Sequence, residues 1–85
     1  MTPEHARRIV LGVLHEIAPL VDVSALRDDS DLRKTLGWDW FDFVHFARLL
    51  SVRSGLRLDG GDLVRLRTLG GAVRWLAPTV IGLPR

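Results

Sequence analysis

This chain of 85 residues lacks several features that define common classes of small proteins. It has no cysteine, which excludes a disulfide framework, a thiolate zinc site and a cysteine nucleophile. Its longest apolar runs, Ile9 to Leu14 and the tail around Val80, are far shorter than the roughly 20 residues that span a bilayer, so we expect no transmembrane helix. The amino terminus lacks the order of basic, apolar and small residues of a signal peptide, and a cytoplasmic location is therefore predicted.

Motifs that mark active sites are missing as well. The sequence contains no serine, histidine and carboxylate arrangement, no glycine-rich phosphate loop and no zinc-ligand spacing. His5 and His15 are about 15 Å apart along a helix, too far to share an ion, and we interpret them and His45 as solvated surface residues. We therefore predict that the chain is not an enzyme and has no catalytic residue, metal or cofactor.

The composition that is present is that of one ordered domain, with 47% hydrophobic and 26% charged residues. Charge is unevenly distributed: through Asp42 eight acids accompany five bases, whereas beyond it seven bases accompany two acids. The basic second half favours an acidic protein surface as partner. A small basic helical nucleic-acid-binding protein remains a further alternative, disfavoured because the acidic first half would repel phosphate.

Apolar spacing and cap residues predict an all-α fold with helices in the order long, long, short, long. The segment from Pro19 to Thr35 breaks the periodicity and is predicted to be a long loop, with a short helical turn at Asp31 to Leu36 that Ser30 caps. The helical domain is assigned to residues 1–77, and the proline-containing residues 78–85 to an extended tail. The predicted helices are 3–18, capped by Thr2; 40–53, capped by Asp39; 62–66; and a last one from Leu69, capped by Thr68 and ended by Pro78.

The predicted second helix has more apolar surface than one small core can cover. One set of residues at helical spacing is suited to core contact: Phe43, Phe46, Ala47 and Leu50. A second set lies off that stripe: Trp40, Phe41, Val44 and Leu49. We therefore expect a partner, or a second copy of the chain, to cover this face.

Three blocks of the sequence resemble the acyl and peptidyl carrier protein family, and the similarity extends over roughly residues 4 to 77. The blocks are Asp29-Ser30-Asp31-Leu32, then Leu36-Gly37-Trp38-Asp39-Trp40-Phe41-Asp42-Phe43-Val44, then Leu58-Asp59 followed by Leu66-x-Thr68-Leu69. The resemblance implies a small four-helix bundle of acyl-carrier-protein type, with a long first loop and a short third helix. It also implies that partner enzymes read the second helix.

The family places a serine that carries phosphopantetheine where this chain has Trp40. An indole has no oxygen and only a donor N–H, so it cannot form the phosphodiester. The aspartates around Ser30 echo the motif, but a helix cap explains them better. The chain is therefore interpreted as a carrier-like domain without phosphopantetheine, a scaffold or regulatory partner in a fatty-acid, polyketide or nonribosomal-peptide pathway. The alternative is a genuine carrier whose attachment serine was replaced by engineering, and only then would phosphopantetheine be its cofactor.

The second helix also lacks most of the acids that typical carriers display, because His45, Arg48 and Arg53 occupy that helix. Basic partners should be attracted poorly, and an acidic surface of a biosynthetic enzyme is the expected partner. Trp40 is either an interface anchor or folds back on the first loop to fill the acyl cleft. The predicted partner-binding residues are Trp38, Asp39, Trp40, Phe41, Val44, His45 and Arg48.

Overall fold

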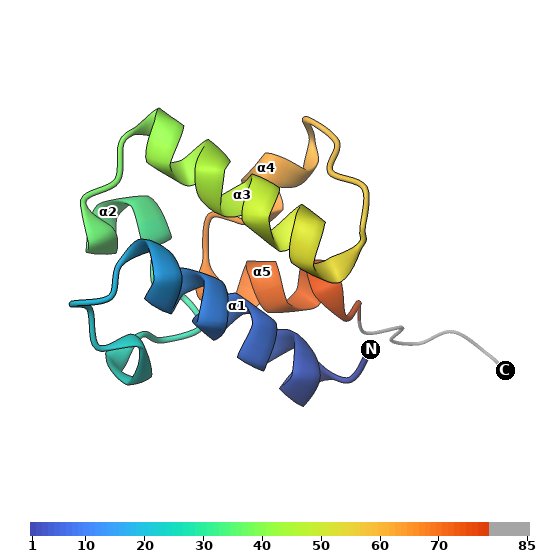
Figure 1. Cartoon of the computed structure of the whole chain (residues 1–85), viewed down its shortest axis with the longest axis horizontal. Coiled ribbons are helices and arrows are strands. Elements are labelled where there is room, and N and C mark those ends of the chain that lie inside the picture. Colours follow the sequence, from blue (N-terminus) through green and yellow to red (C-terminus); the bar gives the residue numbers. More distant parts are fainter. Residues whose placement is uncertain (79–85) are drawn as a thin grey trace, which may run out of the picture.

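The structure, a computed structural model, describes residues 1–78, which are mostly helical and contain no β-strand (Figure 1). The all-α prediction is confirmed for this part of the chain, whereas the predicted tail lies outside the described residues except for Pro78. The elements are α1 (Pro3–Ile17), the 3-10 turn η1 (Val23–Ala25), α2 (Leu32–Leu36), α3 (Trp40–Ser54), α4 (Asp62–Arg65) and α5 (Leu69–Leu76).

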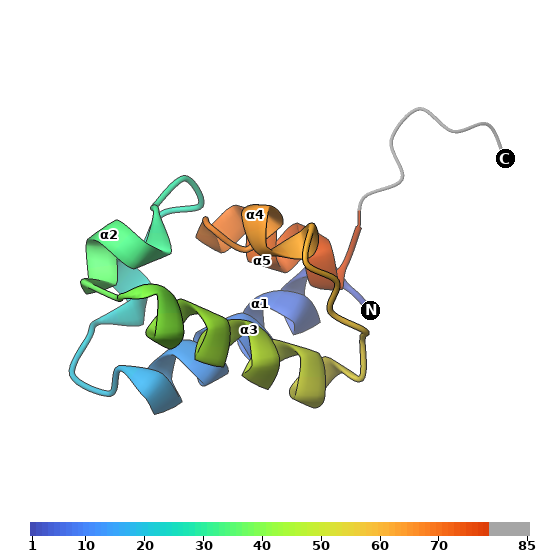
Figure 2. The ribbon, with the colours of Figure 1, turned by 90° about the horizontal axis from the view of Figure 1, so that it is seen from above.

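Helix α1 packs against α3, α5 and η1, whereas α4 packs against α5. It begins where the sequence predicts, since the Thr2 hydroxyl oxygen accepts a hydrogen bond from the His5 N–H at 3.1 Å. It ends at Ile17, one residue before the predicted end. α1 and α3 run side by side in opposite directions, with α2 at the end where α3 begins (Figures 1 and 2).

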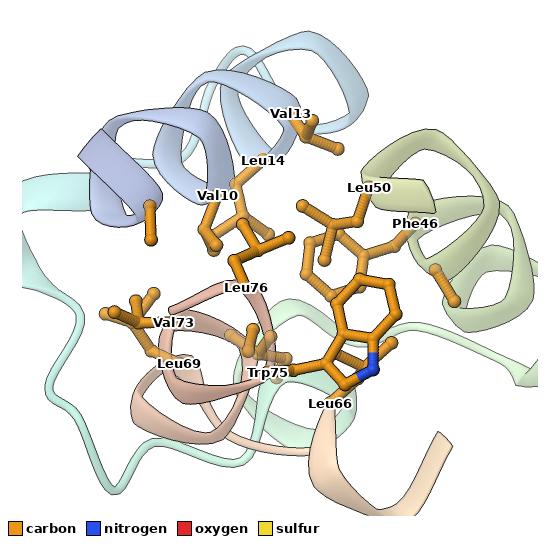
Figure 3. Packing of buried hydrophobic residues seen from close by; sticks show 14 of the residues in the cluster. Val10, Val13, Leu14, Phe46, Leu50, Leu66, Leu69, Val73, Trp75 and Leu76 are labelled. Carbon is orange, nitrogen blue, oxygen red and sulfur yellow. The ribbon is translucent and has the colours of Figure 1, made fainter. Parts of the chain in front are cut away.

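A single hydrophobic core lies between α1, α3 and α5, whose apolar side chains point toward one another (Figure 3). The predicted stripe of the second long helix is confirmed, because its four residues are all buried. The largest fully buried side chains are Phe43, Phe46, Leu14, Leu32, Leu50, Leu66, Leu69, Val10 and Val13.

The long first loop is fixed at its far end by pairing with the chain that leads into α5. The Leu32 N–H donates to the Arg67 carbonyl at 2.8 Å, and the Gly70 N–H donates to the Asp28 carbonyl at 2.8 Å. The prediction that Ser30 caps the following helical turn is wrong. Asp31 is the cap of α2 and accepts from the Lys34 N–H, while the Ser30 hydroxyl oxygen accepts from the Arg27 N–H in the preceding turn.

The order long, long, short, long also needs correction. The described residues contain five α-helices and one 3-10 turn, and the last helix, α5, has only 8 residues. Its start packs closely, because a Cβ added at Gly71 would lie 2.0 Å from the Arg65 carbonyl oxygen. Thr68 caps α5 as predicted, with its hydroxyl oxygen 3.0 Å from the Gly71 nitrogen. Among residues 1–78, no helix combines the length and apolar character needed to cross a bilayer.

Candidate functional site

The start of α3 is fixed by a reciprocal pair of hydrogen bonds. The Asp39 carboxylate accepts from the Asp42 N–H at 2.9 Å, and the Asp42 carboxylate accepts from the Asp39 N–H at 3.2 Å. These bonds satisfy two backbone donors that the first helical turn would otherwise leave without partners. Asp39, predicted as a partner contact, is therefore the exposed cap of α3, and Asp42 is committed to the same cap.

A tight turn joins α2 to α3 and sets their side chains beside each other. Gly37 ends α2 with a φ of 67°, a left-handed conformation that favours glycine, and the Trp38 N–H donates to the Arg33 carbonyl at 2.9 Å. The guanidinium carbon of Arg33 consequently lies 5.9 Å from the ring centroid of Trp40, within the range of a cation–π contact.

Trp40 is the first residue of α3 and is half exposed, with 49% of its surface accessible. Its ring centroid lies 5.9 Å from that of Phe43, whose side chain is buried. Phe41 follows with 81% exposure. The two predicted aromatic contacts therefore present apolar surface to solvent at the start of α3, while one edge of Trp40 rests on the core.

The other predicted contact residues divide between core and surface. Trp38 is partly buried, with its ring centroid 5.3 Å from that of Phe46, so much of it completes the core. Val44 is also partly buried, whereas His45 and Arg48 are exposed on α3. Of the predicted set, Asp39, Trp40, Phe41, His45 and Arg48 are exposed, and Trp38 and Val44 are accessible only in part.

A groove of about 210 Å³ lies beside Trp40, between α3 and α4. The indole and Phe43 form one wall, and Leu63 and Val64 of α4 belong to the other. Val64 is 69% exposed. The remaining lining residues are Arg33, Gly60 and Arg67. Sequence reasoning did not identify this groove, although the apolar pair Leu63-Val64 in a short helix was a signal for it.

A second, more open cavity of about 530 Å³ adjoins the groove across Arg33 and Arg67. Asp31, Lys34 and Trp38 complete its lining. The backbone N–H of Lys34, and to a smaller extent the Arg67 guanidinium 3.3 Å away, lower the pKa of Asp31 below its ordinary value. Asp31 is therefore ionised at neutral pH, and a single carboxylate accompanies three cations in this cavity.

Arg33 belongs to both cavities and has no ion pair with any residue of the described range 1–78. Its Nε–H is buried and has no hydrogen-bond acceptor there. The guanidinium lies over the Trp40 ring at 5.9 Å from its centroid, and buried donors without acceptors are rare in folded proteins. Its positive charge is not balanced by a paired acid within this part of the chain.

The serine hydroxyls of the described residues do not offer a replacement attachment site at the start of α3. Ser51 donates to the Leu56 carbonyl, and Ser54 donates to the Leu50 carbonyl at 2.7 Å, both at the opposite end of that helix. Ser24 donates to the Asp22 carboxylate, and Ser30 is the acceptor in the turn before α2. The residues around Trp40 therefore do not fit covalent attachment of phosphopantetheine.

The three histidines are exposed, as predicted. Within residues 1–78, no three His, Asp or Glu side chains lie close enough together to hold a metal ion. No protein-family model, curated protein or solved structure matches this chain.

Proposed function

We propose that this chain is a carrier-type helical domain that bears no phosphopantetheine and acts by protein contact, as a scaffold or regulatory partner of a fatty-acid, polyketide or nonribosomal-peptide pathway. The observation that carries the proposal is the position of Trp40. It is the first residue of α3, directly after the Asp39 cap, and half of its surface is accessible. A side chain at the place where the carrier family attaches its arm is thus accessible, but it offers an indole and no hydroxyl.

The order of the helices supports a carrier-type fold when α2, with 5 residues, is counted as part of the first loop. α1, α3, α4 and α5 correspond in order to the four helices expected for that family, and a long loop precedes the second of them. α4 is the short third helix, with only 4 residues. α2 is an additional turn in the first loop, at the end of the molecule where α3 begins (Figure 1).

Protein contact is supported by the exposure of the aromatic pair at the start of α3. Phe41 is 81% exposed and its neighbour Trp40 49%. Tryptophan is enriched among the residues that dominate binding energy in protein interfaces, and an exposed aromatic pair gains free energy when a partner covers it. Two copies of the chain could cover the same aromatic pair by associating through this face.

The charges of α3 support an acidic partner. Asp42, the only acid in this helix, already accepts a hydrogen bond in the cap, whereas His45 and Arg48 are exposed. Complementary charge steers partners together and like charge disfavours them. A biosynthetic enzyme with an acidic patch around an apolar depression is the kind of partner that fits.

A photo-crosslinking residue placed at Phe41 tests this proposal in cells of the source organism. We expect a discrete crosslinked protein, identified by mass spectrometry, at position 41 and none at the control position Arg8, which is exposed on α1. Identical crosslinking patterns at the two positions, or none at position 41, would contradict the proposal.

The alternative of a genuine carrier is tested by Trp40→Ser. If the rest of the surface were that of a loaded carrier, a broad phosphopantetheinyl transferase and coenzyme A should modify this variant quickly and completely. We expect slow, partial loading because Asp42 is the only acid of α3, and it already accepts a hydrogen bond in the cap, so the helix offers few acids to the transferase. Rapid, complete loading of Trp40→Ser, read by intact mass, would instead support an ordinary carrier altered at one position.

A further inference from the structure

We propose that the groove beside Trp40 and the adjoining cationic cavity form one site for an acidic segment of a partner protein. An aliphatic or aromatic side chain of that segment occupies the groove, and carboxylates beside it bind Arg33 and Arg67. This inference rests on the protein-contact part of the proposed function and specifies the chemistry of the partner.

The apolar half of the site fits one large side chain. The groove has a volume of about 210 Å³ and is walled by Trp40, Phe43, Leu63 and Val64. This volume is below the roughly 300–1,000 Å³ of most pockets that enclose a small molecule. Because Trp40 and Val64 remain 49% and 69% exposed, a side chain placed between them would remove apolar surface from water on both walls.

The cationic half of the site is positioned to bind carboxylates next to that side chain. Arg33 and Arg67 line both cavities, so these two residues lie at the boundary between the apolar groove and the open cavity. Arg67 shares its charge with Asp31 at 3.3 Å, whereas Arg33 and Lys34 have no ion pair within residues 1–78. The cation–π contact with Trp40 does not neutralise the Arg33 guanidinium, so its positive charge can bind a carboxylate.

The charges around the groove favour a protein segment over a continuous polyanion. Gly60 lines the groove, and its neighbours in this region of the chain include Asp59 and Asp62, with the Asp62 carboxylate accepting from the Asp59 N–H at 2.9 Å. A nucleic-acid backbone would carry phosphates past these acids as well as past the arginines. A peptide can place its acids at the α2 side only, which matches the distribution of charge.

A phage-displayed library of random peptides, about 15 residues long so that four helical turns can form, tests the inference on the full chain. We expect the enriched peptides to combine one Leu, Ile, Phe or Trp with two or more nearby acids. Fluorescence anisotropy then measures the binding of synthetic copies of these peptides. We expect the Arg33→Gln and Trp40→Ala variants to bind them about tenfold or more weakly than the wild-type chain does. The matched control Arg8→Gln should bind like wild type, since Arg8 lies on α1 beside a different cavity.

Several results would overturn this inference. Enriched peptides without acids, acidic peptides that bind Arg33→Gln and wild type equally, or an absence of enrichment would each do so. A dimer detected by light scattering that the Arg33→Gln substitution dissociates would also overturn the inference, because a second copy of the chain would then be the occupant. Binding of duplex DNA that the same substitution abolishes would overturn it as well. Circular dichroism of each variant establishes that the helices remain folded.

The same experiments separate this inference from the proposed function. If the peptides bind Phe41→Ala and Arg48→Gln more weakly than wild type but bind Arg33→Gln normally, the proposed protein contact would be retained. The contact surface would then be the outer face of α3 and not the groove. Loading of the wild-type chain with phosphopantetheine would end the proposed function even if acidic peptides still bound the groove.

Discussion

α3 and α5 both pack against α1, but they divide their residues between core and surface in very different ways. α5 has 8 residues and buries all of them except Arg74. α3 has 15 residues and buries only four, while Trp40, Phe41 and Val52 remain exposed. α5 is thus a core element, and α3 supplies one side to the core and keeps apolar side chains available at its start.

Trp75 and Trp40 show the same difference in one residue type. Trp75 in α5 is 8% exposed and belongs to the core cluster, where its ring lies among side chains from α3 and α5 (Figure 3). Trp40 is 49% exposed, and Phe43 is the aromatic core residue that its ring contacts. Burial indicates a folding role for the first tryptophan, and the exposure of the second beside a groove agrees with the contact role proposed for it.

Alanine substitution of each tryptophan breaks this comparison most directly. Trp75→Ala should lower the free energy of unfolding by about 3–5 kcal/mol, since it leaves a large cavity in the core. That is a large share of the roughly 5–15 kcal/mol that stabilises a typical domain. Trp40→Ala should cost less than about 1 kcal/mol. Urea denaturation followed by circular dichroism measures both, and equal losses would contradict the assignment of roles.

Two glycines sharpen the comparison between a buried and an exposed helix face. Gly71→Ala should lower the free energy of unfolding by about 2–3 kcal/mol, because its Cβ would collide with the Arg65 carbonyl oxygen and push α5 away from the preceding turn. Gly12→Ala is the matched control in α1, where a Cβ meets nothing within 4 Å. It should stabilise the protein by about 0.5–1 kcal/mol. A neutral or stabilising Gly71→Ala in thermal denaturation would contradict the close packing of α5.

The helix caps provide a smaller contrast. Thr68→Ala removes the hydroxyl that accepts from the Gly71 N–H and should lower the free energy of unfolding by about 1 kcal/mol. Asp39→Ala removes the equivalent bond at α3, but the exposed first turn can fray without opening the core, so its effect on global unfolding should be smaller. Hydrogen exchange should instead show faster exchange at the start of α3. A larger global loss for Asp39→Ala would argue that this turn is part of the core.

The smallest expected effect concerns the ion pair that joins α1 to the end of α3. The Arg53 guanidinium, 2.7 Å from the Glu16 carboxylate, lowers the pKa of Glu16 below its ordinary value. The stabilisation is therefore complete above the pKa of Glu16 in the unfolded chain and is lost as the pH falls through the lower pKa that the folded protein gives this group. As the pH is lowered through this range, the melting temperature of Glu16→Gln should fall slightly less than that of the wild-type protein. An unchanged decline would mean that this exposed pair contributes nothing measurable.

Most of the helical structure could be predicted from the sequence because its signals are local. Thr2, Asp39 and Thr68 each bond a backbone N–H three residues ahead, so a cap and the start of its helix are visible in one short window. The buried stripe of α3 follows in the same way from helical spacing.

Features that depend on residues distant in the sequence were not predicted. Ser30 and Asp31 are both suitable caps, and Asp31, the actual cap, directly precedes Leu32, whose N–H bonds to Arg67, 35 positions away. The groove likewise combines Trp40 with Leu63 and Val64 of another helix. The contact between Arg33 and Trp40 depends on the left-handed turn at Gly37 and on one side-chain conformation, neither of which sequence spacing encodes.

The central claim is that Trp40 provides contact surface and tethers no cargo, and one measurement tests it most directly. The wild-type chain is incubated with coenzyme A and a broad phosphopantetheinyl transferase, beside a conventional carrier as positive control, and its intact mass is recorded. We expect no change in mass while the control is fully loaded. A gain of one phosphopantetheine arm on this chain would contradict the claim.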